Sequence, residues 1–69
     1  MSDHVYKMIE IVGTSKVGVD DAIQQAVAKA AKTVKHMGWM EVLSTRGHIV
    51  DGKVDHFQVT IKIGFRLED

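Results

Sequence analysis

The chain has 69 residues, no cysteine, and nine basic residues that balance nine acidic ones. Its length predicts a single domain, residues 1–69, with a small core, and the lack of cysteine excludes disulfides and thiolate zinc sites. The balanced charge gives no argument for a nucleic acid or an anionic membrane as partner. We see no signal peptide and no apolar run that could cross a bilayer, so we expect a soluble, cytoplasmic protein that self-associates or binds a ligand.

The first half of the chain predicts a strand and a helix. Residues 4–13 roughly alternate apolar and charged side chains, as a strand does. Ser15 is a candidate N-cap for a helix over residues 19–37, where apolar residues recur at helical spacing, and Gly38 is expected to end it. The stripe consists of Ile23, Val27, Ala30 and Val34, flanked by Ala22, Ala26 and Ala31, which make a flat face that can approach a sheet closely.

The second half predicts a β-hairpin. Residues 39–49 form one strand, Asp51 and Gly52 carry the signal of a two-residue turn, and residues 54–67 form the last strand. The last strand has the clearest alternation, with one apolar face made by Phe57, Val59, Ile61, Ile63, Phe65 and Leu67. The order β-α-β-β therefore predicts an α+β fold, a three-stranded antiparallel sheet with the third strand in the middle, packed on one helix.

The hairpin turn also predicts which residues face each other. Counting from the turn, Trp39 lies opposite Gly64 on the sheet face away from the helix, beside an open shelf because glycine has no side chain. Glu41 falls opposite Lys62 and is expected to form a cross-strand ion pair. The same count places Arg46 opposite Phe57, on the helix side. A bulge would shift this register by one residue and reverse these assignments.

One helix cannot cover both faces of a sheet, so the face away from the helix must be covered by something else. It is predicted to carry Trp39, Leu43, Gln58, Thr60, Lys62 and Arg66. In one interpretation Trp39 is buried between subunits, as tryptophan often is. In the other it forms a stacking wall for a flat ligand, whose edge Gln58 meets with its amide. The two interpretations are compatible if the ligand lies at an interface.

The sequence gives little support for a metal site, a catalytic site or a nucleic-acid-binding site. The hairpin register places His48 opposite Asp55 and His56 opposite Gly47, so the two histidines point to opposite faces and we expect no metal site. We find no serine, histidine and acid arrangement for nucleophilic catalysis and no phosphate-binding loop. The scattered basic residues and few aromatic residues do not suit nucleic-acid binding.

Three segments together resemble the bacterial dodecins: "VYKMIEIVGTS", "WMEVLSTRGHIVDG" and "HFQVTIKIGFRLED". The resemblance covers nearly the whole chain. It implies a small flavin-binding protein that assembles as a hollow dodecamer and binds flavins in pairs at subunit interfaces, each stacked on a tryptophan. It also implies a flavin store or buffer and not an enzyme, and some bacterial members bind coenzyme A.

The resemblance assigns roles to four residues. Trp39 is the stacking residue, Gln58 hydrogen-bonds the pyrimidine edge of the isoalloxazine, Arg46 lies near the flavin, and Arg66 lies in the ligand and interface region. The chain departs from the family pattern beside the tryptophan, with Gly38 before it and Met40 after it. We expect FMN as the ligand, with riboflavin, FAD and coenzyme A left open. The alternatives are a flavin-dependent reductase, which no dinucleotide fingerprint supports, and a structural oligomer with Trp39 as interface core.

Overall fold

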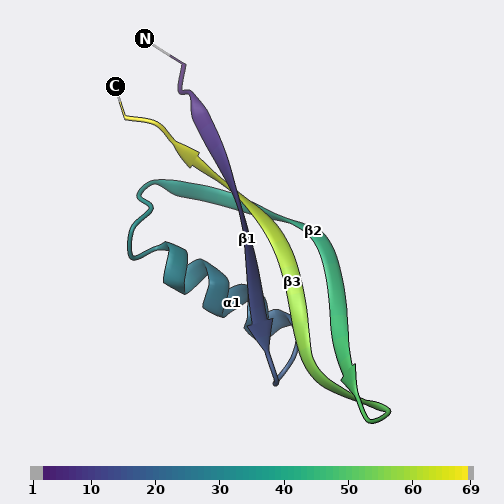
Figure 1. Ribbon diagram of the computed structural model, residues 1–69. Coiled ribbons are helices and arrows are strands. Elements are labelled where there is room, and N and C mark those ends of the chain that lie inside the picture. The colour runs from purple at the N-terminus through teal and green to yellow at the C-terminus, as the bar shows by residue number, and fades with distance from the viewer. Residues whose placement is uncertain (1–2, 69) are drawn as a thin grey trace.

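The computed structural model describes residues 3–68 and contains one helix and one sheet (Figure 1). The elements in chain order are β1 (Tyr6–Ser15), α1 (Val19–Ala30), β2 (Met37–Val50) and β3 (Lys53–Arg66). The strands are arranged β1-β3-β2, and β3 is antiparallel to both neighbours. This confirms the predicted α+β class and the central position of the last strand.

The core lies between α1 and the central strand. Val59, Ile61 and Ile63 alternate along β3 and are 0–1% exposed, and Ala22 of α1 is fully buried against them. Partly buried side chains from β1, α1 and β2 pack against this core, among them Ile9, Ile11, Ile23 and Met40. The alternation puts even-numbered residues of β3, from His56 to Arg66, on the opposite face, which we call the outer face.

The helix is shorter than its sequence pattern predicted. It ends at Ala30. In the next turn, the bonds from Lys32 N to Lys29 O and from Thr33 N to Ala30 O span three residues, and one last bond, from Val34 N to Ala30 O, spans four. His36 then takes a left-handed conformation, with φ of 64°, that turns the chain into β2. The prediction that Gly38 ends the helix was therefore wrong, because Gly38 lies within β2.

The start of the helix differs from the prediction as well. Gly18 is the N-cap, in extended conformation with no side-chain cap, and Ser15 is the last residue of β1. The Ser15 hydroxyl is still central to this turn. It accepts hydrogen bonds from the backbone N–H of Val17 at 2.9 Å and of Gly18 at 3.4 Å, and it donates one to Asp21 Oδ2 at 2.6 Å.

Replacing Ser15 by alanine should destabilise the protein by about 1 kcal/mol at pH 7, because two backbone N–H groups lose their acceptor. The hydrogen bonds from Ser15 and Gln25 lower the pKa of Asp21, so their contribution is present above the ordinary carboxyl pKa and is lost as pH falls through the lowered value. Urea denaturation should show the loss at pH 7, and an NMR titration should show Asp21 titrating at higher pH in Ser15→Ala. Thr14→Ala, at an exposed neighbour, is the control, and equal stability of both variants would contradict the role of the hydroxyl.

The β2–β3 hairpin follows the predicted register at its two ends and departs from it in between. Asp51 and Gly52 form the turn with φ of 52° and 75°, which suits a type I′ hairpin, and Val50 pairs with Lys53. The register then shifts between His48 and Ile49, and shifts back between Val42 and Ser44. The extra residue lies on β3 at the first shift and on β2 at the second, so the two bulges cancel.

The molecule is elongated, with principal extents of 57 × 20 × 13 Å and a radius of gyration of 14.5 Å. A compact domain of this length would have a radius of gyration of about 11 Å. The hairpin of β2 and β3 projects beyond the helix at one end, and the start of β1 and the end of β3 project beyond it at the other (Figure 1). Large apolar side chains on this hairpin are exposed, including Val42, Leu43, Ile49, Val50 and Val54.

Candidate functional site

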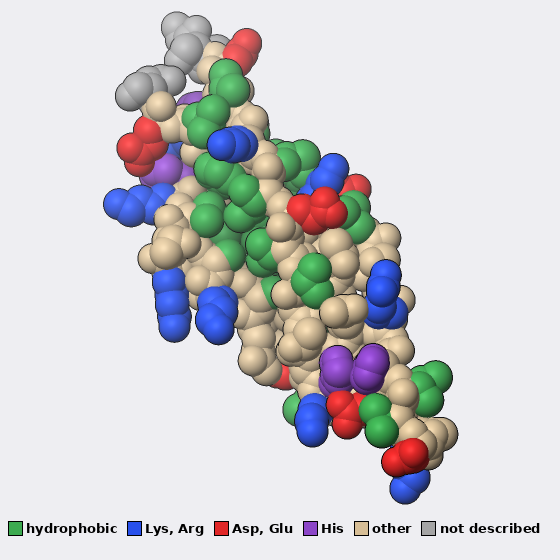
Figure 2. Space-filling view, viewed as in Figure 1, with side chains coloured by type: hydrophobic (Ala, Val, Ile, Leu, Met, Phe, Trp, Pro, Cys, Tyr) green, Lys and Arg blue, Asp and Glu red, His purple; other side chains and the backbone are tan. Residues whose placement is uncertain are grey.

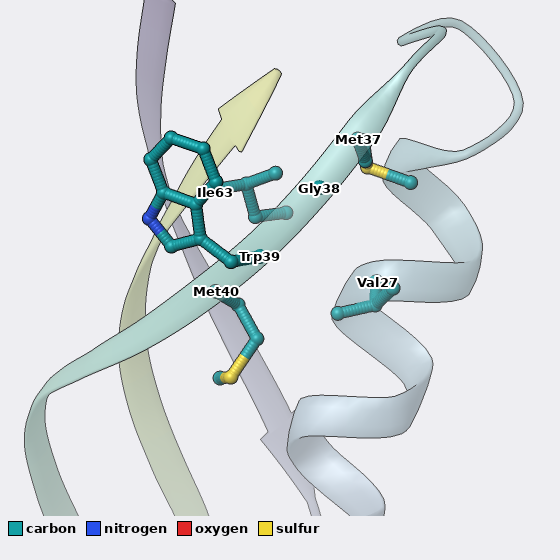
Figure 3. Close-up of a pocket in the computed structure, with 6 residues that line it drawn as sticks. All are labelled: Val27, Met37, Gly38, Trp39, Met40 and Ile63. Atoms are coloured by element: carbon teal, nitrogen blue, oxygen red, sulfur yellow. The ribbon is translucent and has the colours of Figure 1, made fainter. Parts of the chain in front are cut away.

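A bulge at the start of β2 sets the direction of Trp39. Met37 pairs with Phe65 and Trp39 pairs with Gly64, so Gly38 is the extra residue between them. This places Met37 on the helix side, against the core, and Trp39 on the outer face. Figure 3 shows the indole on the side of β2 away from Val27 and α1. The prediction that Trp39 points away from the core is confirmed, and Gly38 has a structural role in the bulge.

The indole lies flat over Gly64. A Cβ added at residue 64 would overlap the six-membered ring of Trp39, so only glycine leaves room for this position. The indole reaches across β3 to Tyr6 of β1, with ring centres 5.2 Å apart and planes inclined by 63°. The predicted open shelf beside the indole is therefore wrong, because the indole itself covers it. Trp39 is still 44% exposed, which leaves apolar aromatic surface available to a planar ligand.

The residues around the indole are mixed in chemistry. Met40 faces Ile63 and packs against the core. Arg66 lies on the outer face two positions from Gly64, opposite Tyr6. Glu41 does face Lys62, which confirms the register there, but no ion pair forms between these two described side chains. The tryptophan end of the outer face therefore combines aromatic surface with a nearby guanidinium group.

Gln58 and Arg46 lie at the other end of the outer face. The hairpin count placed Arg46 opposite Phe57 on the helix side, and this was wrong, because the bulges shift the register by one and pair Arg46 with Gln58. Both side chains thus share the outer face with Trp39. Gln58 is six positions from Gly64 on β3, a separation of about 20 Å in an extended strand. One subunit therefore does not bring Gln58 and Trp39 together.

Sequence reasoning missed two residues at the tryptophan end. Tyr6 contacts the indole, and Met8 lies opposite Gly64 on the side of β3 away from β2. Both come from β1, whose alternation was visible in the sequence. The register between β1 and β3 could not be predicted from the sequence, because no tight turn joins these strands and 37 residues separate Ser15 from Lys53. A hairpin-type calculation was available only for β2 and β3.

The described part of the chain offers little for catalysis. Two histidine–carboxylate contacts are present, His36 Nε2 to Glu68 Oε1 at 2.6 Å and His56 Nδ1 to Asp55 Oδ2 at 2.8 Å. The bond from His56, and then the charge of Lys16, lower the pKa of Asp55. Neither pair lies against a nucleophile within hydrogen-bond reach. No helix among residues 3–68 is long and apolar enough to span a membrane.

Comparison with known proteins agrees with this geometry. The dodecin family model matches residues 5–68. The dodecin of Thermus thermophilus is 49% identical over 65 residues, 94% of each chain. The solved dodecin of Streptomyces coelicolor has a TM-score of 0.94 at 51% identity, covering 100% of this chain and 99% of its own. A T. thermophilus variant with tryptophan replaced by phenylalanine has a TM-score of 0.91 at 46% identity, covering 97% and 100%. The chain therefore belongs to the dodecin family.

Proposed function

We propose that this protein binds and stores a flavin, stacking the isoalloxazine ring on Trp39. The observation that carries the proposal is that the indole is held flat over Gly64 while Trp39 remains 44% exposed. Stacking of a large planar ring removes this aromatic surface from water and adds favourable ring–ring contact. Tyr6 supports the indole from the side and limits its rotation. The residues present therefore fit a flavin, which dodecins in general bind.

The binding site needs two copies of the chain. The separation of about 20 Å between Gln58 and Gly64 exceeds the reach of one ring system that is both stacked on Trp39 and hydrogen-bonded to Gln58. We propose that one subunit supplies Trp39 and a neighbouring subunit supplies Gln58 together with its partner Arg46. The elongated shape and the exposed apolar residues of the hairpin support self-association, and the family supports a dodecamer.

Each residue contributes a distinct interaction to the proposed complex. The carboxamide of Gln58 has both a donor and an acceptor for the pyrimidine edge of the ring. Arg66, on the same face as the indole, and Arg46 have the charge that favours a phosphate, which is why we propose FMN before riboflavin. The same cations suit coenzyme A, whose binding is tested by competition. When bound, the flavin supplies a redox-active ring, and the electron-rich indole quenches its excited state.

We propose storage in place of turnover. The chain has no dinucleotide-binding fingerprint for a nicotinamide donor. Incubating flavin-loaded protein with NADH or NADPH and an electron acceptor tests the alternative of a flavin-dependent reductase. We expect donor oxidation no faster than with free flavin. Sustained oxidation above that rate would favour the reductase.

Titrating the protein into FMN should quench flavin fluorescence, and Trp39→Ala should remove most of this effect. Trp39→Phe should retain a weakened stacking surface and a folded protein, as the solved T. thermophilus variant keeps the fold. We expect an affinity at least tenfold lower for Trp39→Ala, about 1.4 kcal/mol. Fluorescence titrations with FMN, riboflavin and FAD measure this, each repeated with coenzyme A as competitor.

Leu43→Ala is the matched control, because Leu43 lies on the same strand and is exposed to nearly the same extent, 43% against 44% for Trp39. Light scattering gives the mass of every variant and so separates loss of assembly from loss of stacking. Undiminished quenching in an assembled Trp39→Ala would rule out the stacking role. A protein that stays colourless after incubation with all three flavins would favour the structural oligomer instead.

A further inference from the structure

Two histidines stand side by side on the outer face, at the end away from Trp39. His48 of β2 pairs directly with His56 of β3, with ring centres 5.0 Å apart and planes inclined by 24°. Figure 2 shows two histidine side chains next to each other on the molecular surface. The register counted from the turn had placed these residues on opposite faces. That expectation was wrong, because the bulge at Asp55 shifts β3 by one residue.

Asp55 sets the orientation of one of the two rings. Its Oδ2 lies 2.8 Å from Nδ1 of His56. An ionised carboxylate only accepts hydrogen bonds, so this contact places the imidazole proton on Nδ1 and leaves the lone pair of Nε2 free. Histidines that bind metals are held in this way by a carboxylate on their other nitrogen.

We propose that His48 and His56 form a chelating pair for a divalent transition-metal cation of the zinc class, with Asp55 as the orienting residue. Two imidazole nitrogens that each lie about 2.0–2.1 Å from one tetrahedral ion have ring centres about 5 Å apart, which matches the observed spacing. The two rings are stacked in the metal-free structure, so each must rotate about its side-chain bonds to point a nitrogen at the ion. His56 is only partly buried and His48 is exposed, so both rings can turn their nitrogens toward a shared ion. Neutral imidazole suits zinc, copper and nickel better than calcium or magnesium.

The pair supplies two ligands and leaves other positions open. Among residues 3–68, no group of three or more histidine, cysteine, aspartate or glutamate side chains is arranged to hold a metal. Water therefore completes the coordination in a single chain. Arg46 lies on the same face, two positions before His48, and Lys16 lies near Asp55, so local charge does not attract the cation. The binding energy comes from the imidazole nitrogens, and it is lost when they are protonated.

Calorimetric titration of the assembled, full-length protein with Zn²⁺ at pH 7.5 tests the pair. We expect one ion per chain in the unchanged protein, and at least tenfold weaker binding in both His48→Gln and His56→Gln. Asp55→Asn should weaken binding by about tenfold, because it removes the orienting carboxylate. The matched controls are His4→Gln and His36→Gln, which remove the other two histidines.

Each result of the zinc titration either supports the chelating pair or overturns it. One ion per two chains would also support the chelate, with a second copy's histidines in place of water. Binding that is unchanged in His48→Gln and His56→Gln, or that is lost in His4→Gln or His36→Gln, would overturn it. Far-UV circular dichroism and light scattering confirm that each variant is folded and assembled. Because the readout is heat of zinc binding in flavin-free protein, its failure is distinct from any failure of flavin stacking.

Discussion

Gly64→Ala should lower flavin affinity at least tenfold while leaving the fold intact. The added Cβ would overlap the indole of Trp39, and a side chain that is 44% exposed can move away from this contact. The indole would then tilt off the sheet and no longer present a flat face beside Tyr6. We expect the free energy of unfolding to change by less than about 1 kcal/mol, because the strained group can swing into solvent. A tenfold loss of affinity corresponds to about 1.4 kcal/mol.

Two measurements separate the geometry from the function. Tryptophan fluorescence and near-UV circular dichroism of flavin-free protein should change in Gly64→Ala, since the only tryptophan changes its surroundings. Fluorescence quenching of FMN then reports the affinity. Thr60→Ala is the control, because Thr60 lies on the outer face of β3, four positions before Gly64. An unaltered tryptophan signal would contradict the described packing, and an altered signal with normal flavin affinity would contradict the stacking role alone.

Gly13→Ala should cost about 2–3 kcal/mol of stability, the range of overpacking in a tight core. Gly13 lies on β1 opposite Val59, where α1 packs tightly against the sheet. A Cβ there would collide with the carbonyl oxygen of Ala22 and lie 2.9 Å from the Cβ of Ala26. Neither group can move without displacing the helix. Domains of this length have total stabilities of roughly 3–10 kcal/mol, so the loss is a large fraction of the whole.

Urea denaturation followed by far-UV circular dichroism measures this effect. Gly18→Ala is the matched control, because nothing lies within 4 Å of a Cβ at that position and its φ of 168° is extended. We expect it to cost less than about 1 kcal/mol, through a poorer N-cap. All variants are compared at one protein concentration, since self-association contributes to apparent stability. Equal stability of Gly13→Ala and Gly18→Ala would show that the helix can yield at the contact with β1.

Local sequence pattern predicted part of the β2–β3 register correctly. The Asp51–Gly52 turn and strict alternation were enough to place Trp39 opposite Gly64, because both are local properties of the chain. The placement of Trp39 was correct although the predicted register was wrong along the middle of the hairpin. One bulge adds a residue to β3 and the next adds one to β2, so the two errors cancel before Trp39 is reached. Nothing in the sequence signalled either bulge, and the positions between them, including Arg46, were misplaced. Their faces depend on how the long hairpin twists and bends in three dimensions.

The end of the helix was also misplaced by local sequence pattern. Helical periodicity continued to residue 37, but the helix ends at Ala30, because the chain must turn at His36 for Met37 to pair with Phe65. The spacing of apolar residues shows which side chains would share one face of a helix. It carries no information about where the next strand must begin in the fold. The flat alanine face was predicted correctly in Ala22 and Ala26, both of which pack on the sheet.

The sequence by itself determined the element order, the sheet topology, the identity of the core strand and the outward direction of Trp39. These follow from alternation, turn chemistry and strand connectivity, all of which are short-range. Only the tertiary structure decided that the indole lies over Gly64, that Gln58 is too distant to share a ligand with it in one subunit, and that His48 faces His56. These depend on bulges and on contacts between strands far apart in the chain, for which local residue patterns carry no information.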